Sequence, residues 1–107
     1  MKAVAYQTAG SIERPDALVD IDLDMPVAAG HDLLVKVEAI SVNPVDTKVR
    51  TRASAEPGAW KVLGWDVSGE VVAVGAEVTT FAVGDHVFYA GALDRPGANS
   101  EYHLVDE

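Results

Sequence analysis

The chain has 107 residues, of which 17 are acidic and 8 are basic, so its formal net charge is −9. This length suits one domain with one hydrophobic core, and the negative charge repels nucleic acid and anionic membrane surfaces. The chain has no cysteine, which excludes disulfides and thiolate metal sites. It also has no signal peptide and no apolar segment long enough to span a bilayer. These features predict a cytoplasmic protein that does not bind membranes.

The first forty residues are patterned as strands. The chain opens with a strand-like segment, Lys2–Tyr6. In Ala17–Asp24, three apolar residues alternate with three aspartates, which is the period of a half-buried strand with an acidic outer face. Leu33–Ile40 repeats this alternation. It predicts that four side chains face the core: Leu33, Val35, Val37 and Ala39.

The next segment departs from the strand pattern. Asn43 can cap a helix, Pro44 is favoured in a first helical turn, and Asp46 can meet unpaired amides at the third position. We therefore expect a short helix that begins within about two residues of Pro44. Half of the basic residues follow, and they can complement the helix dipole, the favoured interpretation, or attract an anionic ligand. They are Lys48, Arg50, Arg52 and Lys61.

The segment Leu63–Val87 places four glycines in an almost continuous apolar sequence. Glycine inside strand-like sequence marks bulges, tight bends or close backbone approach. Further strands are predicted at Ser68–Val74, His86–Ala90 and Glu101–Val105. Short strands at this density predict a mainly β fold, a partly open β barrel with one or two short helices. The histidines have no partner at metal-ligand spacing and are expected at the surface. They are His31, His86 and His103.

Three segments carry a family resemblance. Residues 64–75 follow the pattern Gly-x-Asp-x-x-Gly-x-Val-x-x-x-Gly and precede a Gly-Asp-x-Val segment at residues 84–87. Residues 42–46 read Val-Asn-Pro-Val-Asp, and residues 97–102 read Gly-Ala-Asn-Ser-Glu-Tyr. Together they resemble the medium-chain dehydrogenases and reductases, in the branch of quinone oxidoreductases and zinc-type alcohol dehydrogenase-like proteins. The resemblance covers nearly the whole chain and implies their GroES-like substrate domain.

This resemblance implies hydride transfer between NAD(P)H, usually NADPH, and a small quinone, enal, ketone or alcohol. It places Asn43, Asp46 and Thr47 in catalytic positions, Asn43 and Trp65 beside NADP, and Trp65 and Asp66 in the substrate cleft. Each position has a structural alternative. Asn43 and Asp46 can be helix caps, Thr47 a residue without a chemical role, Trp65 part of the core or of the cleft wall, and Asp66 a turn residue.

The resemblance also bears on zinc. Asn43 and Trp65 stand where zinc-dependent members carry a cysteine and a histidine ligand. Zinc prefers sulfur, imidazole or carboxylate ligands, and neither an amide nor an indole replaces them. The sequence therefore predicts no zinc.

No Gly-x-Gly-x-x-Gly fingerprint follows a strand, so the nucleotide-binding Rossmann domain is absent from this chain. We expect residues 1–107 to be the N-terminal part of a larger oxidoreductase, homodimeric at full length, and the isolated chain to be inactive. Two other classes stay open: a GroES-like binding module and an assembly domain without catalysis. A co-chaperonin carries a glycine-rich, apolar mobile loop, and Arg50–Trp60 does not resemble one.

Overall fold

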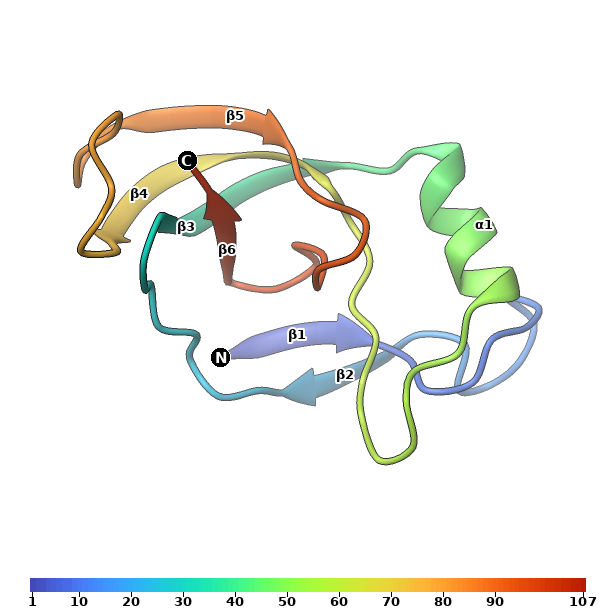
Figure 1. The fold of residues 1–107 in the computed structure, drawn as a ribbon. Coiled ribbons are helices and arrows are strands. Elements are labelled where there is room, and N and C mark those ends of the chain that lie inside the picture. The colour runs from blue at the N-terminus through green and yellow to red at the C-terminus, as the bar shows by residue number, and fades with distance from the viewer.

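A computed structural model describes the whole chain, residues 1–107 (Figure 1). The elements follow in the order β1 (Lys2–Ala5), β2 (Val19–Asp22), β3 (Asp32–Ser41), α1 (Pro44–Arg52), β4 (Asp66–Val74), β5 (His86–Ala90) and β6 (Tyr102–Asp106). All six predicted strands are present within about two residues of their expected ends. The helix begins at Pro44, as predicted, and is neither long nor apolar enough to cross a membrane.

The strands form two antiparallel sheets. β1 pairs with β2 in one sheet, and the other sheet has the strand order β5-β4-β3-β6. In Figure 1 the larger sheet curves over the β1–β2 pair, and α1 stands at the end of the molecule where β3 finishes. The two sheets do not close into one barrel, so the partly open, mainly β fold is confirmed.

Two glycines allow the close backbone approach that their positions predict. A Cβ atom on Gly69 would overlap the Lys36 carbonyl on β3, and a Cβ atom on Gly75 would overlap the Gly30 carbonyl. The strict alternation predicted for β3 is wrong. Irregularities between Leu34 and Val35 and beyond Val37 change the side of the sheet that residues face. Three consecutive residues, Leu33, Leu34 and Val35, are therefore buried, and Ala39 is exposed.

The core consists of two small clusters. Leu33, Val35 and Val71 form one cluster beneath the larger sheet. Tyr6, Leu63 and Trp65 form the other, and α1 packs against it through Val45 and Val49. The two valines are four residues apart and so lie on one helix face. The second cluster fixes the position of α1, and with it the residues at the start of that helix.

Tyr89 and His103 join the two edges of the larger sheet. Tyr89 lies on β5 and His103 on β6, yet the Tyr89 hydroxyl is 2.7 Å from His103 Nδ1 and the two rings stack at 5.8 Å. The expected surface position of His103 is wrong, because its exposed fraction is 4%. This contact brings together strands that are separated by β4 and β3 in the sheet.

Candidate active site

Two hydrogen bonds between Asn43 and Asp46 define the start of α1. Asn43 precedes the helix in extended conformation, with φ −125° and ψ 165°. Its backbone N–H donates to Asp46 Oδ2 at 2.8 Å, and its carbonyl accepts from the Asp46 N–H at 3.0 Å. This is the cap geometry that the Asn-Pro-x-Asp spacing predicts.

Asp46 is buried, and both its carboxylate oxygens are used. Its exposed fraction is 6%, and Oδ1 accepts a hydrogen bond from the Gly64 N–H at 2.8 Å. Gly64 has a φ of +95°, a conformation that side chains disfavour. Asp46 therefore fastens α1 to the turn before β4. This position supports the capping interpretation, and it directs the carboxylate into the protein.

The Asn43 side chain turns toward β4. Its Nδ2 donates to Asp66 Oδ2 at 2.7 Å and lies 3.4 Å from the Ser41 carbonyl oxygen. Asp66 is the exposed first residue of β4, and Ser41 is its register partner on β3. Thr47 is exposed and donates its hydroxyl to the Pro44 carbonyl at 2.9 Å. Asn43, Asp46 and Asp66 are thus directly connected, whereas Thr47 bonds only within its own helix.

Trp65 borders a different part of the surface. Its exposed fraction is 4%, and its Nε1 donates to the Arg95 carbonyl at 3.3 Å. It lines a cavity of about 250 Å³ whose other walls include the exposed residues Trp60 and Leu93. Asp66 lines a separate groove of about 540 Å³ on the face of β3, β4 and β5, next to Phe88. Trp65 and Asp66 therefore belong to two different hollows of this chain.

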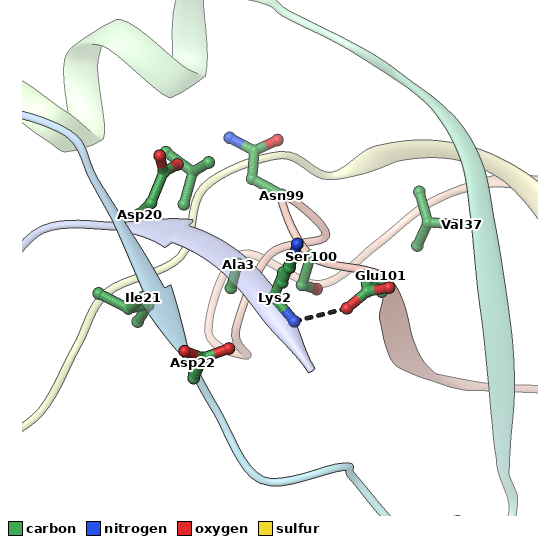
Figure 2. A pocket seen from close by; sticks show the side chains of 10 residues that line it. Lys2, Ala3, Asp20, Ile21, Asp22, Val37, Asn99, Ser100 and Glu101 are labelled. Atoms are coloured by element: carbon green, nitrogen blue, oxygen red, sulfur yellow. Dashed lines mark hydrogen bonds between the residues drawn. The ribbon is translucent and has the colours of Figure 1, made fainter.

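The largest hollow contains none of the predicted site residues. It has a volume of about 600 Å³ and lies between the β1–β2 pair and the segment Asn99–Glu101. Figure 2 shows Asp20 and Asp22 on β2, and Asp22 is the register partner of Lys2 on β1. The Lys2 backbone N–H donates to Glu101 Oε1 at 2.6 Å. Val37 on β3 adds a wall from the larger sheet.

The sequence indicated no functional role for four residues that the structure connects: Arg95, Pro96, Tyr89 and His103. Arg95 supplies the carbonyl for Trp65, and Pro96 supplies a carbonyl 2.9 Å from His103 Nε2. Nε2 therefore carries the hydrogen, and Nδ1 accepts from Tyr89. Burial lowers the pKa of His103 and raises the pKa of the Tyr89 hydroxyl. A period-two reading of β6 could have indicated His103, since Val105 also faces the first core cluster.

The residues at the expected zinc positions do not fit a zinc ion. Trp65 Nε1 carries a hydrogen, which it donates to Arg95, so it has no lone pair for a metal. The Asn43 amide nitrogen is bound to Asp66. No group of three or more histidine, cysteine, aspartate or glutamate residues in the chain is arranged to hold a metal ion.

Comparison with known proteins extends this description. The chain is 40% identical over its full length to a zinc-type alcohol dehydrogenase-like protein of Staphylococcus epidermidis, of which it covers 31%. A crystal structure of a candidate zinc-dependent alcohol dehydrogenase from Rhizobium etli matches 99% of the chain with a TM-score of 0.95 and 54% identity, over 30% of its own length. Escherichia coli quinone oxidoreductase complexed with NADPH matches 99% of the chain with a TM-score of 0.83 and 27% identity, over 31% of its length.

The chain thus spans about a third of the length of these relatives. The alcohol dehydrogenase GroES-like domain matches residues 28–107, which include α1, β4 and the Asn43–Asp66 pair. The strand order and the capped helix agree with that match. This chain belongs to the alcohol dehydrogenase GroES-like domain family.

Proposed function

We propose that residues 1–107 form the N-terminal substrate domain of a larger NAD(P)H-dependent oxidoreductase. Quinones, enals, ketones or alcohols are its substrates, and a carbonyl or activated double bond receives the hydride. The family match and the relatives named alcohol dehydrogenase-like and quinone oxidoreductase support this assignment. NADPH in the complex of the Escherichia coli relative supports NADP as the cofactor. The nucleotide-binding domain is expected outside residues 1–107.

The Asn43–Asp66 hydrogen bond is the observation that carries the proposal. An amide nitrogen has two hydrogens. Asp66 accepts one at 2.7 Å, and the other meets only the more distant Ser41 carbonyl at 3.4 Å. Asp66 therefore orients the amide and leaves one hydrogen weakly bonded. That hydrogen can donate to a substrate oxygen on which negative charge develops, close to the positive end of the α1 dipole.

The chemistry is shared between cofactor and chain. A bound nicotinamide supplies the hydride. Asn43, which is paired with Asp66, positions the oxygen of the acceptor, and Trp65 borders a second hollow that we assign to the substrate cleft of the longer protein. Because the donor set does not fit zinc, we propose that the reaction is zinc-independent. Homodimerisation of the full-length protein and a cytoplasmic location remain predictions.

Replacing Asn43 separates its two roles. In the longer enzyme, Asn43→Ala removes both the cap and the donor, so turnover falls by about 100- to 1,000-fold, the loss typical of an oxyanion donor. Stability also falls by about 1 kcal/mol. Asn43→Ser is the matched control, because serine caps a helix equally well but lacks the amide. It retains the melting temperature and still loses turnover. Unchanged turnover in both variants would leave Asn43 with a capping role alone.

A further inference from the structure

Arg95 and Asp32 form a bidentate ion pair that joins the loop between β5 and β6 to the start of β3. Arg95 Nη1 and Nη2 donate to Asp32 Oδ1 and Oδ2 at 2.9 and 2.8 Å. Asp32 is the first residue of β3, and its carbonyl accepts the Gly75 N–H at 2.8 Å. Asp32 is therefore a fixed anchor. The paired guanidinium lowers the pKa of the Asp32 carboxyl, so the pair is fully charged at neutral pH.

The loop between β5 and β6 is fastened unevenly. Its second half is bonded to the segment before β4, because the N–H groups of Gly97, Ala98 and Asn99 donate to the carbonyls of residues 62, 64 and 63. Its first half, residues 92–96, has one internal backbone bond, from the Arg95 N–H to the Ala92 carbonyl at 3.2 Å. The Arg95 side chain adds two charge-assisted hydrogen bonds between this half and the start of β3.

The first half of this loop receives the two buried ring N–H groups described above. The Arg95 carbonyl accepts from Trp65 Nε1 at 3.3 Å, and the Pro96 carbonyl lies 2.9 Å from His103 Nε2. Both ring nitrogens belong to residues with an exposed fraction of 4%. If the loop moves, each ring N–H loses its acceptor, which costs free energy because both residues are largely buried.

We propose that the Asp32–Arg95 ion pair is a positioning device for Trp65. The Arg95 guanidinium binds Asp32 and so fixes the loop. The Arg95 carbonyl in that loop accepts the hydrogen bond from Trp65 Nε1, and this bond keeps the indole in one orientation in the cavity wall. Arg95 thus acts through Trp65 and is a positioning residue. A bidentate, partly buried pair suits this task, because its geometry is defined in a way that a single-contact surface pair is not.

A fixed indole gives the cavity a fixed size. The cavity beside Trp65 holds about 250 Å³, which is small compared with typical ligand pockets of about 300–1,000 Å³. The other walls carry Trp60 and Leu93 together with charged residues such as Glu56 and Lys61, so a planar group of modest size that also carries a polar substituent fits between them. This consequence rests on the proposed function, in which Trp65 borders the substrate cleft. The positioning of Trp65 itself does not.

Hydrogen exchange of the Trp65 indole tests the positioning directly. A Trp60→Phe background leaves Trp65 as the sole tryptophan, so one indole N–H resonance is observed. In this chain, Arg95→Gln and Asp32→Asn each remove the bidentate pair. Both accelerate indole exchange by about tenfold, which corresponds to about 1.4 kcal/mol of local stability. Arg95→Lys keeps the charge but not the fork, and gives a smaller acceleration.

The control breaks a different arginine pair. Arg14 contacts Asp16 at 3.4 Å at the surface, and Arg14→Gln leaves the indole exchange unchanged. The exchange of the Val71 amide in the core reports global opening, and it changes less than the indole in the Arg95 and Asp32 variants. Equal indole exchange in parent, Arg95→Gln and Asp32→Asn would overturn the proposal, as would acceleration of both probes by the same factor. Asp32→Asn is nearly isosteric and keeps the test valid if Arg95→Gln does not fold.

The cleft consequence has its own readout in the longer enzyme. There, Arg95→Gln raises the KM for a bulky quinone several-fold and lowers kcat less, because the wall is displaced while Asn43 is not. An unchanged KM would overturn this consequence. A parent enzyme without any activity would instead contradict the proposed function, while the indole exchange would still decide the positioning.

Discussion

At the scale of single residues, Tyr89 and His103 connect the two edge strands of the larger sheet. His103 Nδ1 accepts from Tyr89 at 2.7 Å, and Nε2 lies 2.9 Å from the Pro96 carbonyl. Both ring nitrogens are satisfied in a buried place when the imidazole is neutral. The pair therefore acts as a clasp between β5 and β6, the two edge strands of the larger sheet.

Removing the Tyr89 hydroxyl tests this clasp. Tyr89→Phe leaves a buried acceptor on His103 without a donor, which costs about 1–3 kcal/mol of unfolding free energy. Tyr102→Phe is the matched control, because the Tyr102 hydroxyl makes no hydrogen bond within the chain. Denaturant unfolding of both variants measures the difference. Equal stability of the two variants would show that the clasp contributes nothing.

The residues of the site differ in how far sequence could predict them. Asn43, Pro44 and Asp46 form a local pattern with known cap geometry, so their arrangement was predictable from spacing alone. The hydrogen bond from Asn43 to Asp66 joins residues that are 23 positions apart. Arg95 lies 63 positions from Asp32. No local pattern reports such pairings, because the fold brings the partners together.

At the scale of elements, the end of β6 is fastened to two loops. Glu107 Oε1 accepts from the N–H groups of Thr79 and Thr80 at 3.0 and 2.9 Å, and Oε2 lies 2.8 Å from His31 Nδ1. The hydrogen bond with His31, followed by those from Thr79 and Thr80, lowers the pKa of Glu107 from 4.5 to about 2. The same hydrogen bond raises the pKa of His31 above 6.5.

These two shifts define a pH window. The lowered pKa of Glu107 stabilises the folded state above about pH 4.5, and this contribution is lost as the pH falls toward 2. The raised pKa of His31 stabilises it below about pH 6.5, and this contribution is lost as the pH rises through the folded value. The fastening is therefore strongest between about pH 4.5 and 6.5.

Hydrogen exchange of the Thr79 and Thr80 amides tests this pH window, because these amides are bonded to Glu107. His103 is bonded to Tyr89 instead, so its titration does not act on these amides directly. After correction for the intrinsic exchange rate, protection of the Thr79 and Thr80 amides decreases as the pH rises above about 6.5. The variant His31→Gln abolishes that decrease, because glutamine does not titrate. Protection that declines equally in parent and variant would refute the role of His31.

The elements themselves were largely predictable, and their irregularities were not. Periodicity located all six strands, and the Asn-Pro-x-Asp pattern located the start of α1. The irregularities in β3 depend on its pairing with β4, where Gly69 lets the Lys36 carbonyl come close. A single strand does not encode its partner, so the exposure of Ala39 could not be read from its own segment.

At the scale of the whole molecule, the density of short strands and the glycine pattern of residues 64–84 together indicate the fold class from the amino-acid sequence. At Gly69 and Gly75, a backbone carbonyl from a neighbouring segment occupies the space that a side chain would need. The positions of such close contacts depend on how the whole sheet is folded. The division of Trp65 and Asp66 between two hollows was not predictable, since adjacent residues of an extended segment point to opposite faces and either face could have bordered the cleft.

Oxidation of NADPH by the longer protein tests the central claim most directly. Loss of NADPH absorbance is followed with a quinone, an enal and a ketone, for the longer protein and for residues 1–107 alone, before and after dialysis against EDTA. We predict turnover of at least one acceptor by the longer protein, equal turnover after dialysis, and none by the isolated chain. A longer protein that is inactive with all three acceptors, or that regains activity only when zinc is added, would contradict the account.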